Sequence, residues 1–597
     1  MPLFYEKPMA PADDIPYAAV PRASTGGRVR FSDELHDSDA ADVEDNVLFD
    51  QPTDVLEVTD NDTLYYGVSL GTRRRMRKGR WFWITVVALV IVSVVGVFWL
   101  YFDGISWMQR SKKRNVILMI SDGFGPASET MARNYVQQIQ GLPVDYQSPL
   151  DEILVGSSRT RSSDSLVTDS AAGATAFSCG IKSYNGAIGL SSNQSPCGTV
   201  LEAAKLQRNM KTGLVATSRI THATPGAFSA HVTHRDMEDL IAEYQIGNYS
   251  LGPVVDLMFG GGRCHFEPST HANSSCRADA RNLIGEAQER GFRVLGTRKE
   301  FDALNAESAG KQLPILGTFA ASHMDYEIDR DEHEQPSLAE MSQKALDILD
   351  QATQHSNAGF FLMIEGSRID MAAHTNDPAA HVREIVAYWE AISVVRKYID
   401  SHPDTVMISV SDHETGGFSV AKQLGPEYPE YRWNPQALKA AKHSIEYISS
   451  QLLSTRASED SGERYQLVRD TVFPKWMGIA DATHEEILQV AQETNSVSLR
   501  QLLSTAISDR AELGWATHGH SAVDVNLYAY GQDAKLLRGN HENTDIGDFI
   551  VQALGLDLQS ITNLIRNDRV VQNTQTVKDT WLGRRDLDAP EHYPHTH

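Results

Sequence analysis

Residues 116–120 read VILMI, and the next three residues read SDG, so a short apolar run ends at Ser121, Asp122 and Gly123. A run of this length that is closed by a turn is typical of a strand buried on both faces of a parallel sheet. The chain therefore places a polar turn directly after a buried strand. Similar apolar runs lie at 213–217, 254–259, 360–364 and 406–410.

Helical patterns separate several of these runs, for example at 338–351 and 382–399. Strands that alternate with helices predict an α/β fold whose central sheet is mainly parallel and flanked by helices. Residues 421–515 lack strong apolar runs and have a more helical pattern. We interpret this region as an inserted subdomain.

The overall composition is that of a globular protein, with 41% hydrophobic and 22% charged residues among 597. Collagen-like, low-complexity and wholly disordered classes are excluded. The net charge of −24 argues against nucleic-acid binding, which needs a basic face to meet phosphates. The charge is uneven: residues 1–70 carry −11, residues 71–80 carry +6, and residues 103–597 carry −19.

Residues 81–102 form an uncharged apolar stretch, WFWITVVALVIVSVVGVFWLYF. As a helix it would span about 33 Å, enough to cross the hydrocarbon core of a bilayer. Aromatic residues stand near both ends, as in an interfacial belt. A buried core helix would rarely lack a polar edge, and a signal peptide would begin near residue 1. The stretch therefore predicts a transmembrane helix.

Six Lys and Arg residues between 73 and 80 precede this span and favour an N-terminus in the cytosol. The protein is then a single-pass type II membrane protein. Residues 1–80 read as a disordered acidic cytosolic tail with a basic collar. The segment 65–68, YYGV, fits a pattern that a cytosolic sorting adaptor could bind, although such short matches often arise by chance. Residues 103–114 are a linker, and residues 566–597 are a polar C-terminal extension open to processing.

Cysteines and glycosylation sequons lie beyond the predicted span. Two sequons, at Asn248 and Asn273, fit glycosylation in a secretory compartment. An even number of cysteines there is compatible with two disulfides. Short separations favour disulfides between Cys179 and Cys197 and between Cys264 and Cys276, but three connectivities are open. The cysteines are Cys179, Cys197, Cys264 and Cys276.

Four of the apolar runs are followed by side chains that could bind a metal. In open α/β sheets ligands bind at the carboxyl ends of strands, so these side chains should meet at one edge. Each of them alone could be an ordinary loop residue, but all four clusters together are harder to explain in that way. The residues concerned are Asp122, His222, Thr224, Glu365, Asp412 and His413.

Asp370 and His374 are four residues apart, so on a helix both would face one side and could hold one cation. An ordinary structural pair is the alternative. His518 precedes the apolar stretch 523–530, where a single histidine is more often structural than a ligand.

Asp169 and Ser170 open a run of small residues, SAAGATAF. Asp169 is typical of a turn or cap, and Ser170 would begin a helix whose free N–H groups favour an anion. A serine there could attack phosphorus if a metal lowered its pKa. The plainer interpretation is a helix-capping serine.

Taken together, these motifs resemble those of the alkaline phosphatase family in residue type and order. The resemblance covers about residues 112–555 and, with the N-terminal span, is strongest to the fungal vacuolar members. The motifs are DGFG at 122–125, DSAA at 169–172, HATP at 222–225, EGSRID at 365–370, DHETGG at 412–417 and TH at 517–518.

The resemblance implies a three-layer α/β sandwich as the catalytic domain, residues 115–565, that hydrolyses phosphate monoesters through a phosphoserine. Ser170 matches the nucleophile and Arg235 the phosphate-binding arginine, whose planar fork suits phosphate oxygens. The implied cofactors are two zinc ions and one magnesium ion per subunit. One zinc matches Asp370, His374 and His518; the other matches Asp122, Asp412 and His413; magnesium matches Asp122, Thr224 and Glu365.

The chain departs from the family pattern at one pair of positions, where His222 occurs together with Met371. We expect Asp169 and His222 to orient other groups of the site rather than to bind metal directly. The resemblance also implies a homodimer in the vacuolar membrane that acts on small phosphomonoesters and on phosphopeptides. Alternatives are a phosphodiesterase or sulfatase of the same superfamily, or a non-catalytic membrane-tethered interaction protein.

Overall fold

The computed structural model describes residues 113–271, 274–454 and 461–566. The predicted cytosolic tail, the apolar span 81–102, Asn273 and residues 567–597 lie outside these described residues. Within them, none of the helices combines the length and the apolar character needed to cross a bilayer.

The described chain is built on a ten-stranded sheet whose centre is β1 (Asn115–Ile120), the strand predicted from VILMI. β7 (Phe360–Glu365) and β8 (Thr405–Val410) flank β1, and both pairings are parallel. The apolar run at 254–259 becomes a strand only from Leu257 onward. The full order is β12 (Gly539–Glu542), β2 (Leu154–Arg159), β11 (Val525–Gly531), β8, β1, β7, β3 (Lys211–Arg219), β4 (Leu257–Gly261), β6 (Ile315–Thr318) and β5 (Arg293–Leu295).

Only β11 runs against its neighbours, because it pairs antiparallel with both β2 and β8. The prediction of an α/β fold with a mainly parallel sheet is therefore confirmed. All six residues of β1 are buried, and alternate residues enter the cores on opposite faces. Burying one such Ile, Leu or Met side chain stabilises the fold by about 1.5–3 kcal/mol relative to exposure.

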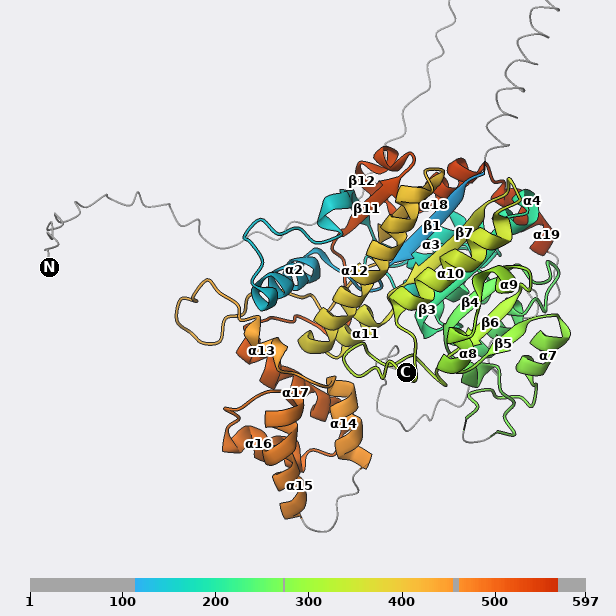
Figure 1. Ribbon diagram of the computed structural model, residues 1–597. Coiled ribbons are helices and arrows are strands. Elements are labelled where there is room, and N and C mark those ends of the chain that lie inside the picture. Colours follow the sequence, from blue (N-terminus) through green and yellow to red (C-terminus); the bar gives the residue numbers. More distant parts are fainter. Residues whose placement is uncertain (1–112, 272–273, 455–460, 567–597) are drawn as a thin grey trace, which may run out of the picture. The chain divides into compact units, whose positions relative to one another are not determined.

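Helices cover both faces of the sheet (Figure 1). One core lies beneath α2 (Pro126–Gln140), α10 (Leu338–Thr353) and α12 (Pro378–Ser401). The other lies beneath α3 (Ser170–Cys179), α4 (Val200–Arg208), α6 (Glu238–Gln245), α18 (Asn543–Leu554) and α19 (Leu558–Ile565).

The described residues between 421 and 515 contain helices and no named strand, and Figure 1 draws them in orange. The elements are α13 (Gln436–Lys439), α14 (Ile445–Ser454), α15 (Ser461–Leu467), the π-helical η3 (Val468–Trp476), α16 (His484–Gln492) and α17 (Ser496–Ala511).

The four cysteines form the disulfides Cys179–Cys197 and Cys264–Cys276. Their Cα atoms are 6.0 and 4.9 Å apart, within the range that a disulfide can bridge. The first disulfide ties the last residue of α3 to the segment that leads into α4.

Candidate active site

Three neighbouring strands place their polar ends at one edge of the sheet. Asp122 follows β1, Glu365 ends β7, and Asp412 and His413 follow β8. All four side chains are fully buried. Because β8, β1 and β7 are adjacent and parallel, residues that are far apart in the chain meet at a single site.

A short helix, α11 (Arg368–His374), brings two further side chains to this edge. Nε2 of His374 lies 3.2 Å from Oδ2 of Asp370, the pair expected from their spacing of four residues. Gly123 allows this approach, since its φ is +70° and a Cβ there would lie 2.7 Å from Oδ1 of Asp370.

Ser170 is the first residue of α3, and its hydroxyl points into the same cluster. Asp169 caps the helix by accepting a hydrogen bond from the backbone N–H of Ala172. Oγ of Ser170 lies 3.1 Å from Nε2 of His413 and 3.5 Å from Oδ1 of Asp122. The small residues of α3 permit this proximity, because a Cβ at Gly173 would lie 2.9 Å from the Cβ of Asp412.

Groups of potential ligand atoms gather in three places among the described residues of this edge. Within each group all ligand atoms lie within 4.8 Å of one another. The groups are Asp122 with Asp412 and His413, Asp122 with His222 and Glu365, and Asp370 with His413 and His520.

The third group corrects one expectation, because it contains His520 and not His518. β10 (His520–Ser521) pairs antiparallel with β9 (Glu414–Thr415), which lies next to His413. Nε2 of His520 is 3.2 Å from Nε2 of His374, and its ring stacks on that of His413 at 3.5 Å. Nδ1 of His518 instead faces the backbone carbonyl of His374 at 2.8 Å. The structure therefore favours His520 over His518 as a ligand of this group.

Several buried oxygen atoms at this edge have no hydrogen-bond partner: Oδ2 of Asp122, Oγ1 of Thr224, Oε1 of Glu365 and Oδ2 of Asp412. Thr224 lies on α5 (Ala223–Gly226), directly after β3. An unpaired buried polar atom is costly, so these atoms point to bound cations as their missing partners. The oxygen atoms of Asp122, Thr224 and Glu365 suit magnesium, and mixed His and carboxylate groups suit zinc.

The charges of these carboxylates support the same conclusion. Burial raises the pKa of Asp122 well above its ordinary value, and the nearby carboxylates of Asp412, Asp370 and Glu365 raise it further. Burial likewise raises the pKa of Glu365 and of Asp412 to about 7. Such a cluster remains ionised at neutral pH only if positive charge is bound within it.

Arg235 lies beside the cluster and is almost fully buried. Its Nη1 donates to Oδ2 of Asp169 at 3.3 Å, and its Nη2 lies 3.0 Å from Nε2 of His222. Burial lowers the pKa of His222 to about 3, so its ring is neutral and can accept a hydrogen bond from Arg235 through Nε2. His222 was expected to orient other groups of the site, but the sequence does not indicate that Arg235 is one of them.

The glycosylation candidate Asn248 is partly buried. Its amide nitrogen donates to Oε2 of Glu243 at 2.9 Å, and its oxygen accepts from Arg290 at 3.1 Å. Glycosylation at Asn248 stays a prediction.

Comparisons with known proteins agree with this geometry. The family model for alkaline phosphatase matches residues 113–556. The repressible alkaline phosphatase of Saccharomyces cerevisiae is 48% identical over 77% of this chain and 84% of its own length. An alkaline phosphatase of Schizosaccharomyces pombe is 45% identical over 81% of this chain and 89% of its own length.

Solved structures show the same fold. The alkaline phosphatase of Thermus thermophilus superimposes with a TM-score of 0.63 at 28% identity, covering 75% of this chain and 92% of that one. A mutant alkaline phosphatase of the Antarctic bacterium TAB5, described with magnesium in its M3 site, has a TM-score of 0.52 at 25% identity, covering 75% and 99%. The chain belongs to the alkaline phosphatase family and is an enzyme that acts on phosphate monoesters.

Proposed function

We propose that the chain hydrolyses phosphate monoesters through a phosphoserine on Ser170, assisted by two zinc ions and one magnesium ion. The observation that carries this proposal is the position of Ser170. Its hydroxyl lies at a helix N-terminus, against His413 and Asp122, within a cluster of buried carboxylates whose oxygen atoms lack partners.

The ligand sets are assigned by residue type and proximity. Asp370, His374 and His520 would hold one zinc ion; Asp122, Asp412 and His413 would hold the other; Asp122, Thr224 and Glu365 would hold magnesium. When bound, these cations lower the pKa of a nucleophilic hydroxyl or water and stabilise the charge on attacking and leaving oxygens.

Ser170 forms and then loses the covalent bond to phosphorus. Its Oγ attacks the phosphorus atom, a new Oγ–P bond forms, and the bond to the alkoxide leaving group breaks in line with it. Water then attacks the phosphoserine, which releases inorganic phosphate and restores the hydroxyl. The free N–H groups at the start of α3 favour the negative charge of the phosphoryl group at both stages.

Arg235 binds the nonbridging oxygens of the phosphoryl group. Its planar guanidinium can donate two parallel hydrogen bonds, and its contacts with Asp169 and His222 hold it in place. A monoester presents more nonbridging charge than a diester, so this arrangement favours monoesters.

We also propose that residues 81–102 anchor the enzyme in the vacuolar membrane, with the N-terminus in the cytosol, the catalytic domain in the lumen and a homodimer as the assembly. The basic collar before the apolar stretch supports this orientation. Two disulfides in the catalytic domain suit an oxidising compartment.

The test compares wild type and Ser170→Ala in the full-length protein. Wild type should hydrolyse p-nitrophenyl phosphate much faster than bis(p-nitrophenyl) phosphate, and acid quenching with labelled substrate should trap phosphate on the enzyme. Ser170→Ala should lose both the turnover and the label while it keeps its metal content. A variant that retained turnover would refute the nucleophile, and a preference for the diester would refute the substrate class.

A further inference from the structure

A short segment of chain, residues 186–190, pairs with the backbone around Arg235. The N–H of Arg235 donates to the carbonyl of Gly186 at 2.8 Å. Ile188 and Val232 exchange backbone hydrogen bonds of 3.1 and 3.0 Å. The position of the Arg235 backbone therefore follows the position of this segment.

The same segment is bonded to the helix that carries Ser170. The N–H of Gly186 donates to Oδ2 of Asp169 at 2.9 Å, and this carboxylate also receives Arg235. Farther along α3, Oγ1 of Thr175 accepts from the N–H of Gly189 at 3.1 Å and donates to the carbonyl of Ala187 at 3.2 Å. One segment thus links the nucleophile helix to the arginine.

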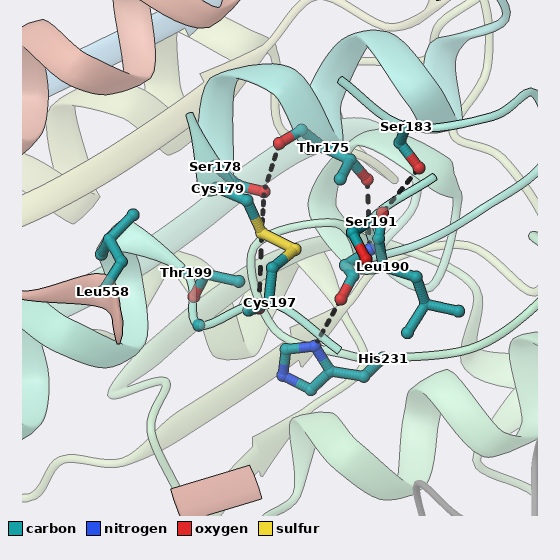
Figure 2. Close-up of a disulfide and its surroundings, with 12 residues drawn as sticks. Thr175, Ser178, Cys179, Ser183, Leu190, Ser191, Cys197, Thr199, His231 and Leu558 are labelled. Atoms are coloured by element: carbon teal, nitrogen blue, oxygen red, sulfur yellow. Dashed lines mark hydrogen bonds between the residues drawn. A yellow bond between two sulfur atoms is a disulfide. The ribbon is translucent and has the colours of Figure 1, made fainter. Parts of the chain in front are cut away.

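Two hydrogen bonds that hold this segment in place meet at the carbonyl of Gly189. Its carbonyl accepts from the N–H of Cys197 at 3.0 Å and from Nδ1 of His231 at 2.9 Å. Cys197 is disulfide-bonded to Cys179 at the end of α3, and Figure 2 shows the ring of His231 close to this disulfide. The φ of Gly189 is +59°, and a Cβ there would lie 2.2 Å from the carbonyl oxygen of Ala230. Only glycine fits this position.

The other side of the His231 ring is held just as firmly. Its Nε2 lies 2.9 Å from Oε1 of Glu202, and both side chains are fully buried. Glu202 also accepts from the hydroxyl of Tyr249 and from the backbone N–H of Thr199.

The surroundings of His231 favour its charged form. Both of its ring nitrogens face acceptors, a carbonyl and a carboxylate, and a ring that donates to both carries a positive charge. Although burial alone would raise the pKa of Glu202, the charge of His231 holds it below its ordinary value. A ring fixed from both sides can hold Gly189 in one position.

We propose that His231 is a positioning residue for Arg235: its hydrogen bond to the Gly189 carbonyl, supported by the Cys179–Cys197 disulfide, keeps the arginine aligned with Ser170. This inference rests on the proposed role of Arg235 in binding phosphate. His231 touches neither substrate nor metal and acts only through the segment 186–190.

Two substitutions separate the two hydrogen bonds of the ring. In His231→Gln, the amide nitrogen replaces ring Nε2, so the bond to Glu202 is kept and the bond to Gly189 is lost. In His231→Asn, the amide nitrogen replaces ring Nδ1, so the bond to Gly189 is kept and the bond to Glu202 is lost.

The readout is the inhibition constant of inorganic phosphate in the full-length enzyme, measured together with thermal stability. We expect His231→Gln to raise this constant about five-fold, as the loss of one hydrogen bond implies. His231→Asn should keep it near the wild-type value even though it lowers the melting temperature more, because it removes the hydrogen bond to the fully buried carboxylate of Glu202, which His231→Gln keeps. Equal losses in both variants, or losses in the opposite order, would overturn the proposal.

A double-mutant cycle tests whether the effect passes through Arg235. Arg235→Ala should weaken phosphate binding, and adding His231→Gln to it should weaken binding no further. If Arg235→Ala leaves phosphate binding unchanged, the proposed role of Arg235 fails. If Arg235→Ala weakens binding but His231→Gln does not, or if the two effects simply add, the positioning role of His231 alone is wrong.

The second disulfide provides a matched control. Replacing both Cys179 and Cys197 by alanine should raise the phosphate inhibition constant in the same direction as His231→Gln. Replacing both Cys264 and Cys276 by alanine removes a disulfide that, among the described hydrogen bonds, has none to residues 186–190, and it should leave the constant unchanged. Equal effects of the two double replacements would contradict the assigned role of the first disulfide.

Discussion

Buried carboxylates occur in two different settings in this molecule. At the edge of the sheet, Asp122, Glu365 and Asp412 are fully buried, and each has one oxygen atom without a hydrogen-bond partner. Glu202 and Glu238 are also buried, but both face cationic side chains. Glu238 receives two nitrogen atoms of Arg219 and the hydroxyl of Thr221.

This difference distinguishes the carboxylates of the candidate active site from the carboxylates that stabilise the fold. Attraction to their cationic partners holds the pKa values of Glu202 and Glu238 below the ordinary value despite burial, which by itself would raise them. At the sheet edge, burial and mutual repulsion raise the pKa values. The paired carboxylates are satisfied within the protein, whereas the unpaired ones need cations from outside it.

The largest expected effect is that of Asp122→Asn, because Asp122 belongs to two of the three ligand groups. Turnover of p-nitrophenyl phosphate should fall by more than ~100-fold. A residue that only orients a metal ligand would cost at most about 100-fold when it is replaced. The free energy of unfolding in a chelator should not fall, since the substitution removes an unpaired buried charge. If the variant is clearly less stable than wild type in the presence of the chelator, Asp122 stabilises the fold instead of holding a metal ion.

Glu202→Ala should have the opposite profile. Removing one partner of a buried ion pair leaves the charge of His231 without its carboxylate, and it should cost about 3–5 kcal/mol of unfolding free energy. Urea denaturation measures this loss. Because Glu202 lies in none of the ligand groups, zinc and magnesium content should be unchanged. If Glu202→Ala lost zinc or magnesium, Glu202 would not be a purely stabilising carboxylate, and the distinction between the two settings would fail.

Glu129 gives an intermediate case, since its partners Ser148 and Trp389 carry no charge. Burial raises its pKa from 4.5 to about 7. Its protonated form is thus favoured by folding: the contribution to stability is complete below pH 4.5 and is lost as pH rises through about 7. Glu129→Gln should remove this pH dependence, worth up to about 3 kcal/mol. If the unfolding free energies of wild type and variant changed in parallel between pH 4.5 and 8, the raised pKa of Glu129 would be contradicted.

The smallest effect is expected at the surface. Asp302 is half-exposed and pairs with Arg298, which also binds Glu340 through two nitrogen atoms. Asp302→Ala should change the unfolding free energy by no more than about 0.5 kcal/mol, with unchanged turnover. A larger change would show that exposure is a poor guide to the cost of losing a carboxylate here.

Much of the sheet could be predicted from sequence, because strands buried on both faces have uninterrupted apolar runs. The ends of those strands also showed where Asp122, Glu365, Asp412 and His413 would meet. His520 could not be distinguished from His518, because the choice depends on the pairing of β10 with β9, two strands of two residues each. The contact of His222 with Arg235 and the support of Gly189 by His231 depend on loop geometry that has no periodic pattern.

The central claim is that the unpaired carboxylates at the sheet edge hold catalytic metal ions. The most direct test is metal analysis of the purified full-length enzyme, together with its turnover before chelation, after chelation and after metal is added back. We predict two zinc ions and one magnesium ion per chain, loss of turnover on chelation, and recovery only when both metals are restored. Full turnover in protein that contains no zinc would contradict the account.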